Sequence, residues 1–157
     1  MEIRKFQPED AAATARVITD ALRISNAKDY PPEYIEYNIA THTPEVLIQR
    51  ANEGHMYVVC DGSKIVGCGT IAPYWGSQTE SILLTIFVQP EYQGKGVGRL
   101  IINTLEQDEY FLRAERVEIP ASITGVEFYK KMGYNYKNGV DELEDGVMYR
   151  LEKFPKK

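Results

Sequence analysis

The chain has 157 residues, of which 43% are hydrophobic and 26% charged, and its formal net charge is −5 at pH 7. Such values are typical of one folded domain, here residues 1–157, and they argue against intrinsic disorder and against a nucleic-acid partner. No apolar run approaches the roughly 20 residues that span a bilayer, and the first residues lack the apolar core of a signal peptide. We therefore expect a cytoplasmic protein with no membrane partner.

The N-terminal part predicts one strand and three helices. Residues 1–6 alternate apolar and polar side chains, as a half-buried strand does. A helix begins at Pro8 and ends near Ser25, and its inward face holds Ala13, Val17, Ala21 and Ile24. Two further helices begin at Pro32 and Pro44, because proline is favoured at the first helical position.

A hairpin follows, with strands over residues 55–60 and 64–75. The intervening turn pairs Cys60 with Ile65 and Cys68 with Tyr57 if the register is regular. The two thiols then lie on opposite faces of the sheet, so we expect neither a disulfide nor a metal site. Gly67 and Gly69 in the second strand predict a bulge or the close approach of a neighbouring element.

The next strand, residues 81–88, is apolar on both faces, which is typical of a central strand covered by helices on both sides. A helix follows, and its sheet-facing side holds Val97, Leu100, Ile101, Thr104, Leu105 and Leu112. Residues 116–119 form a further strand. A strand-helix-strand connection of this kind predicts that strands 81–88 and 116–119 are parallel.

Thr124 and Glu127 form a capping box, so a helix begins there, and Gly133 ends it. Residues 134–136 and 147–151 then predict a closing antiparallel hairpin. The fold class is therefore α/β (α+β), a mixed and mostly antiparallel sheet of about seven strands with helices on both faces and one parallel pair at its centre.

A glycine-rich turn, Gln93-Gly94-Lys95-Gly96-Val97-Gly98-Arg99, joins the central strand to its helix. Backbone N–H groups at a helix start, together with the helix dipole, form a ready site for phosphate. The turn lacks the Gly-Lys-Ser/Thr of a nucleotide P-loop, and Ile101 stands where the dinucleotide fingerprint needs a glycine. The remaining pattern is Gln-x-x-Gly-x-Gly.

Residues 86–99, with this pattern, resemble the acyl-CoA-binding signature of the GNAT superfamily of N-acetyltransferases. Residues 121–134, with the pair Phe128-Tyr129 and Gly133-Tyr134, resemble a later helix of that family. The resemblance implies that the central parallel strands splay apart and that acetyl-CoA lies in the opening. The positions that it implies for contacts with the coenzyme are Ile86, Phe87, Val88, Gln93, Gly94, Lys95, Gly96, Val97, Gly98, Arg99 and Ser122.

The resemblance also implies chemistry. Tyr129 matches the family's general acid, which assists the departing thiolate. For the general base, Glu80 and Glu118 are the best-placed carboxylates and would act through water, because the strand carries apolar Ile82 and Leu84 where some relatives have a glutamate. His42 and His55 are weaker candidates, and each of the two carboxylates is more typical of a plain surface residue than of a base.

The implied function is an acyl-CoA-dependent N-acyltransferase that moves an acetyl group to a primary amine of a small molecule or a protein, by direct attack in a ternary complex. Tyr30, Tyr34 and Trp75 are candidates for the acceptor pocket, although core packing explains the tyrosines as well. An alternative is a non-catalytic acyl-CoA sensor or scaffold. The sequence leaves a homodimer open.

Overall fold

The computed structural model describes residues 1–155. In this part of the chain one seven-stranded sheet has the order β1-β2-β3-β4-β5-β7-β6. Its β4–β5 pair is parallel and its other pairs are antiparallel, which confirms the predicted mixed sheet. The strands are β1 (Glu2–Lys5), β2 (His55–Asp61), β3 (Lys64–Pro73), β4 (Glu80–Val88), β5 (Arg116–Ser122), β6 (Asn135–Tyr136) and β7 (Met148–Lys153).

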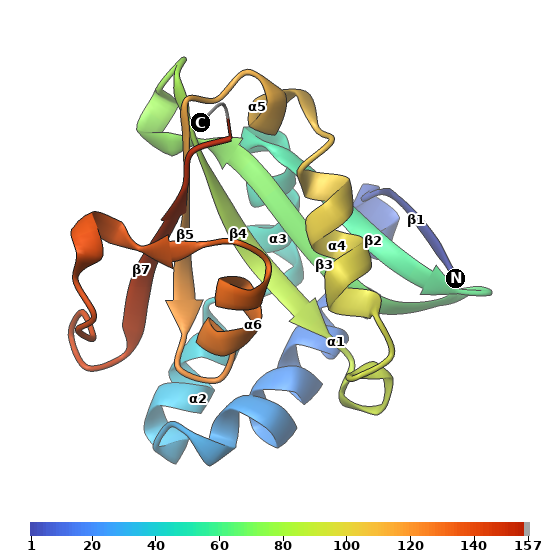
Figure 1. The fold of residues 1–157 in the computed structure, drawn as a ribbon. Helices are drawn as coiled ribbons and strands as arrows, with labels where there is room; N and C mark the ends of the chain where they lie inside the picture. The colour runs from blue at the N-terminus through green and yellow to red at the C-terminus, as the bar shows by residue number, and fades with distance from the viewer. Residues whose placement is uncertain (156–157) are drawn as a thin grey trace.

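Helices cover both faces of the sheet (Figure 1). One core layer packs α4, α5 and α6 against the sheet, and the other packs α1, α2 and α3. None of the helices among residues 1–155 is long and apolar enough to cross a membrane. The helices are α1 (Ala11–Asp20), α2 (Pro32–Ala40), α3 (Pro44–Glu53), α4 (Val97–Leu105), α5 (Glu109–Leu112) and α6 (Val126–Lys131).

The first helix ends differently from the prediction. After α1 the chain continues as a π-helical segment, Ala21–Ser25, in which one extra residue per turn rotates the following side chains. Leu22 and Ser25 are therefore buried, whereas Ile24, predicted to face inward, is 57% exposed. The helical periodicity alone did not predict this rotation.

The β2–β3 hairpin contains a bulge that the regular register did not predict. The pairing shifts between Val59 and Cys60, so Cys60 faces Ile65 as predicted but Cys68 faces Val58. Both cysteines consequently pack in the same core layer, which corrects the prediction of opposite faces. Both are buried free thiols.

The helix after the glycine turn is shorter than predicted. α4 ends at Leu105, and a turn separates it from α5, so Leu112 lies outside the predicted stripe and is 56% exposed. Val97, Ile101 and Leu105 do face the sheet and are fully buried or nearly so. A Cβ on Gly69 would lie 2.4 Å from Cγ2 of Ile101, so this glycine allows the helix to approach β3 closely.

The predicted capping box of Thr124 and Glu127 does not form at the start of α6. Thr124 donates its hydroxyl hydrogen to Asp29 Oδ2 at 2.7 Å, and the turn before the helix is instead held by Ser122 Oγ, which accepts from the Gly125 N–H at 2.9 Å. The predicted C-terminal glycine is present, since Gly133 follows the helix with a left-handed φ of 98°.

The parallel strand pair is short. Glu80, Ser81 and Ile82 pair with residues 116–118, and no further pairs connect the two strands within the described chain. Figure 1 shows β4 and β5 side by side at one end and diverging toward α1 and α2 at the other. The splay that the sequence resemblance implied is therefore present.

Candidate active site

A cleft of about 700 Å³ occupies the splay between β4 and β5. It extends from the glycine turn before α4, past the diverging strands, to side chains of α2 and α3 on the other side of the sheet. The cleft is therefore continuous from the predicted phosphate site to the predicted acceptor region.

One end of the cleft is the start of α4. Gly94 and Gly96 have left-handed φ values of 74° and 86°, which favour glycine, and Gly96 provides no side-chain cap. The first N–H groups of α4 therefore have no side-chain partner at this turn, and a Cβ placed on either glycine would have no neighbouring atom within 4 Å. Open space, bare donors and the helix dipole suit a diphosphate.

The predicted coenzyme residues divide into two groups. The cleft is lined by Gln93, Gly94, Gly96, Gly98, Arg99 and, from β5, Ser122. Lys95 lies outside the cleft wall, 5.5 Å from the centroid of the Tyr92 ring, and Val97 is a core residue with 2% exposure. Gln93 donates its side-chain amide to Ser25 Oγ at 2.8 Å, so it also ties the turn to the π-helical segment.

The strand β4 is bent beside the cleft. The β3–β4 register shifts opposite Gly69, and Thr85 has a left-handed φ of 54°. Such a bulge leaves an extra residue out of the ladder. Ile86, Phe87 and Val88 follow it, line the cleft and have no partners on β5, so their backbone is available to a ligand on that edge.

Tyr129 reaches the cleft from α6. It is 8% exposed and lines the cleft wall, and its hydroxyl has no hydrogen-bond partner among residues 1–155. Burial raises the pKa of the Tyr129 phenol well above its usual value, and interaction with the Cys68 thiol adds to the rise. The hydroxyl therefore stays protonated at neutral pH and is free to donate a hydrogen bond.

The acceptor residues that were predicted from sequence do not all reach the cleft. Tyr30 and Tyr34 line it and stack at 4.7 Å, but the Tyr30 hydroxyl is fully engaged. It donates to the Val147 carbonyl at 2.6 Å and accepts from the Ile123 N–H at 2.8 Å. Trp75 is 88% exposed and lies outside the lining.

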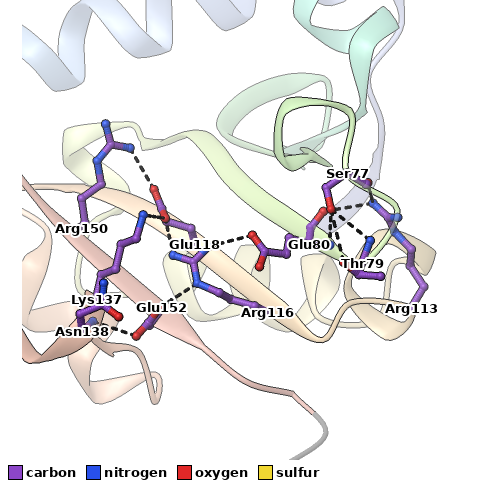
Figure 2. A network of polar contacts seen from close by, with 10 residues as sticks. All are labelled: Ser77, Thr79, Glu80, Arg113, Arg116, Glu118, Lys137, Asn138, Arg150 and Glu152. Carbon is purple, nitrogen blue, oxygen red and sulfur yellow. Dashed lines mark hydrogen bonds and ion pairs between the residues drawn. The ribbon is translucent and has the colours of Figure 1, made fainter.

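Neither of the two carboxylates predicted as the base lies in the cleft wall. Figure 2 shows Glu118 among the cations of Arg116, Lys137 and Arg150, in a network that also includes Glu80. Glu118 is fully buried, and Arg116 contacts Glu80 at 3.2 Å. Burial acts to raise the pKa of Glu118, but hydrogen bonds from Arg116 and Lys137 outweigh it and lower the pKa. These pairs hold the closed end of the parallel strands.

Three polar residues line the acceptor end instead, namely Asn38, His42 and Arg50. The His42 Nδ1 atom lies 2.7 Å from the Asn38 carbonyl oxygen, which only accepts, so Nδ1 carries the hydrogen and Nε2 is the basic nitrogen. Burial lowers the pKa of His42, and the charge of Arg50 lowers it further. The sequence offered His42 only as a weaker base and did not indicate Asn38 or Arg50, because no local pattern brings these separate helices together.

Solved structures with the same architecture span this chain almost completely. A GCN5-related N-acetyltransferase structure from Rhodopseudomonas palustris is 25% identical, with a TM-score of 0.79 over 98% of this chain and 94% of the other. The PaiA N-acetyltransferase of Thermoplasma acidophilum, solved with coenzyme A, is 23% identical, with a TM-score of 0.82 over 98% of both chains. An aminoglycoside 6′-N-acetyltransferase complexed with coenzyme A is 19% identical, with a TM-score of 0.65 over 99% and 97%.

A search among curated protein sequences gave no significant match. The family model described as the acetyltransferase (GNAT) domain matches residues 52–136, which is more than half of the chain and includes β2 to β5, the glycine turn and Tyr129. The splayed strands, the bare start of α4 and this match agree, and the chain belongs to the GNAT acetyltransferase family.

Proposed function

We propose that this protein is an N-acetyltransferase that moves the acetyl group of acetyl-CoA to a primary amine by direct attack in a ternary complex. The observation that carries the proposal is the continuous cleft that joins the bare start of α4 to a polar pocket through the splayed strands. Two ligands then approach each other from opposite ends. The coenzyme A complexes of the PaiA enzyme and the aminoglycoside acetyltransferase support the same use of the cleft here.

Residues of this chain account for the steps that the reaction needs. The N–H groups of α4 and the side chain of Arg99 bind the phosphates, and the free edge of residues 86–88 binds the pantetheine arm. A backbone N–H beside the Thr85 bulge polarises the thioester carbonyl. One such donor typically lowers an acyl-transfer barrier by about 2.7 to 4 kcal/mol.

Tyr129 assists the leaving thiolate by a hydrogen bond. A free phenol has a pKa of about 10 and a thiol about 8.5, so complete proton transfer is already uphill by about 2 kcal/mol. The raised pKa of Tyr129 increases that cost. The phenol therefore stabilises the charge on sulfur while the thiolate takes its proton later, from solvent.

His42 is the proposed proton acceptor for the attacking amine. Among residues 1–155 no aspartate or glutamate lines the cleft, so Glu80 and Glu118 are not proposed for this role. The lowered pKa keeps His42 neutral at pH 7, with its lone pair on Nε2. The acceptor attacks as the neutral amine, which is a minor form at pH 7 because an alkylammonium ion has a pKa of about 10.4. Its nitrogen becomes acidic once it bonds the acetyl carbon, and a weak base then suffices to take that second proton.

A non-catalytic acyl-CoA sensor is the alternative, and one experiment separates the two. Calorimetry measures coenzyme A binding, and a thiol reagent detects coenzyme A released from acetyl-CoA in the presence of a panel of amines. Release that depends on the amine supports the transferase. Tight binding without release for any amine would support the sensor, and absence of binding would exclude both.

The proposed domain organisation and cellular location are consistent with an acetyltransferase. We propose that residues 1–157 act as one catalytic domain in the cytoplasm, a reducing compartment that keeps thiols such as Cys60 and Cys68 free. The fold alone does not identify the acceptor: one structure with this architecture is named for an aminoglycoside acceptor, whereas the name of the PaiA N-acetyltransferase states none.

A further inference from the structure

At the acceptor end of the cleft, the guanidinium of Arg50 has N–H groups that no side chain of the described residues accepts from. Arg50, on α3, lines the cleft and donates from Nη1 to Thr85 Oγ1 at 2.8 Å. A guanidinium has five N–H donors, and among residues 1–155 Arg50 has no other side-chain hydrogen bond and no carboxylate within ion-pair distance. Its remaining donors are therefore available to a ligand.

The environment makes an anionic ligand favourable at Arg50. Burial lowers the pKa of its guanidinium, and the charge of Glu53 only partly opposes this effect. A half-buried cation without a counterion is costly, and a bound anion relieves that cost. Thr85, the partner of Arg50, is the bulge residue beside the proposed site of acetyl transfer. An anion on Arg50 therefore lies near the reacting groups.

The rest of the cleft wall is unsuited to a polycation. Its charged residues within the described chain are Arg50 at the acceptor end and Arg99 at the coenzyme end, and no acidic side chain lines it. The acidic side chains that give the chain its net charge of −5 lie outside the cleft wall. Glu118, a buried acid on β5, is neutralised by Arg116, Lys137 and Arg150. A spermidine-like or aminoglycoside-like acceptor would meet positive charge here.

We propose that the acceptor is an amino acid or a related amine that carries a carboxylate, with the carboxylate bound to Arg50. This inference rests on the proposed acetyl transfer. The planar guanidinium matches the two carboxylate oxygens. The neutral amine, having lost its first proton to solvent, then bonds the acetyl carbon through its nitrogen, and the carbon–sulfur bond breaks. The second proton leaves nitrogen for His42 Nε2, and the thiolate is protonated by solvent. The products are an N-acetyl amino acid and coenzyme A.

The test compares amino acids with their own carboxamides. Release of coenzyme A gives kcat/KM for each pair, and the acid-to-amide ratio is measured in the wild type and in Arg50→Gln. An amino acid and its carboxamide differ in the pKa of their amine, but this difference is the same in both proteins. It therefore cancels when the acid-to-amide ratio of the variant is divided by that of the wild type. A hydrogen-bonded charge pair is worth roughly 10-fold to 100-fold, so the ratio should fall by about that factor in Arg50→Gln.

The control is Arg23→Gln, which removes the same charge from an exposed ion pair with Glu36 outside the cleft wall and should leave the ratio unchanged. If Arg50→Gln does not fold, Arg50→Lys serves instead and should lower the ratio several-fold, because an ammonium lacks the paired contact. A ratio that is the same in wild type and Arg50 variants, or a preference for spermidine, would overturn the proposal.

A binding measurement keeps this inference separate from the proposed function. Calorimetry compares N-acetyl amino acids with their amides on the protein saturated with coenzyme A. Tighter binding of the acids that disappears in Arg50→Gln supports the carboxylate site even if no amine releases coenzyme A. Equal binding of acids and amides in the wild type contradicts the site even if acetyl transfer to other amines is observed.

Discussion

At the scale of single residues, the proposed chemistry depends on two side chains whose neutral forms are favoured by burial. The Tyr129 phenol and the His42 imidazole both line the cleft, and in each the neutral form is favoured. A neutral phenol donates a hydrogen bond and a neutral imidazole accepts a proton. Tyr129 therefore provides a hydrogen-bond donor and His42 a proton acceptor. No acidic residue among the described residues of the cleft wall is needed for either role.

Replacement of Tyr129 by phenylalanine tests the first of these roles. The variant removes one hydroxyl and keeps the ring that fills the core, so kcat should fall by roughly 100-fold to 10,000-fold while coenzyme A affinity changes little. Steady-state kinetics and calorimetry measure the two quantities. Tyr37→Phe is the control, since it removes a hydroxyl from an exposed tyrosine outside the cleft wall and should leave kcat unchanged. Turnover that is unchanged in Tyr129→Phe would remove Tyr129 from the mechanism.

The pH profile tests His42. Its pKa lies below 6.5, first because of burial and then because of Arg50, whereas the hydrogen bond to the Asn38 carbonyl acts in the opposite direction. The neutral form is the proton acceptor, so kcat should show an acid limb as the pH drops through that lowered pKa, in addition to the gradual loss of the neutral amine. His42→Gln should lower kcat and lose this acid limb. His55→Gln, at a histidine bound to Asp108 outside the cleft, should keep it.

At the scale of elements, local irregularities position the site. The π-helical segment turns Ser25 toward Gln93 of the glycine turn, and the bulge at Thr85 opposes Gly69. Both irregularities insert a residue into an otherwise regular element. The chain thereby brings polar groups to the cleft that a regular helix or strand would direct elsewhere.

Gly69 is the element-scale test. In Gly69→Ala the new Cβ would lie 2.4 Å from Cγ2 of Ile101, so α4 must move away from β3. Such overpacking typically lowers the free energy of unfolding by about 1 to 3 kcal/mol, which urea denaturation measures. Ile101→Leu removes the branched methyl group, and in the double variant part of the loss should be recovered. Two simply additive losses would contradict the proposed contact.

The elements that the sequence predicted correctly have strong local signals. Pro32 and Pro44 begin helices, Gly133 follows one, and the glycine turn lies between a strand and a helix, because these features depend on the backbone conformation of a few residues. The bulge beside Cys60 was missed because strand register depends on both partners. The partners of Glu118 were missed for a similar reason, since Lys137 and Arg150 come from later segments.

At the scale of the whole molecule, the sheet is two parts joined at one end of the β4–β5 pair. The join consists of three residue pairs and the charge network around Glu118. The network crosses from β5 to β7 through Arg150, and Arg116 extends it to Glu80 on β4. It therefore helps to fix where the strands stop pairing and where the cleft begins.

Glu118→Gln tests that role. Removing one partner of a buried ion pair typically costs about 3 to 5 kcal/mol of unfolding free energy. The pKa of the Glu118 carboxyl is lowered in the folded protein, so its contribution is present above the unfolded value of 4.5 and is lost as the pH falls through the folded value. The difference between variant and wild type should thus be large at pH 7 and smaller at acidic pH.

The control for Glu118→Gln is Glu144→Gln, whose exposed carboxylate pairs with Arg150 at the surface and should matter little for stability. Denaturation curves at the two pH values supply the comparison. The cleft assignments also predict that folded Glu118→Gln keeps its kcat. A stable variant without turnover would instead restore the general-base role that the sequence suggested.

The double hydrogen bond of the Tyr30 hydroxyl has a consequence for biosynthesis. Its two partners lie 93 and 117 positions later in the chain, at Ile123 and Val147. The glycine turn that is proposed to bind the phosphates is therefore synthesised well before Tyr30 gains its last hydrogen-bond partner. The acceptor wall that contains Tyr30 is complete only when the segments around Ile123 and Val147 have folded against it.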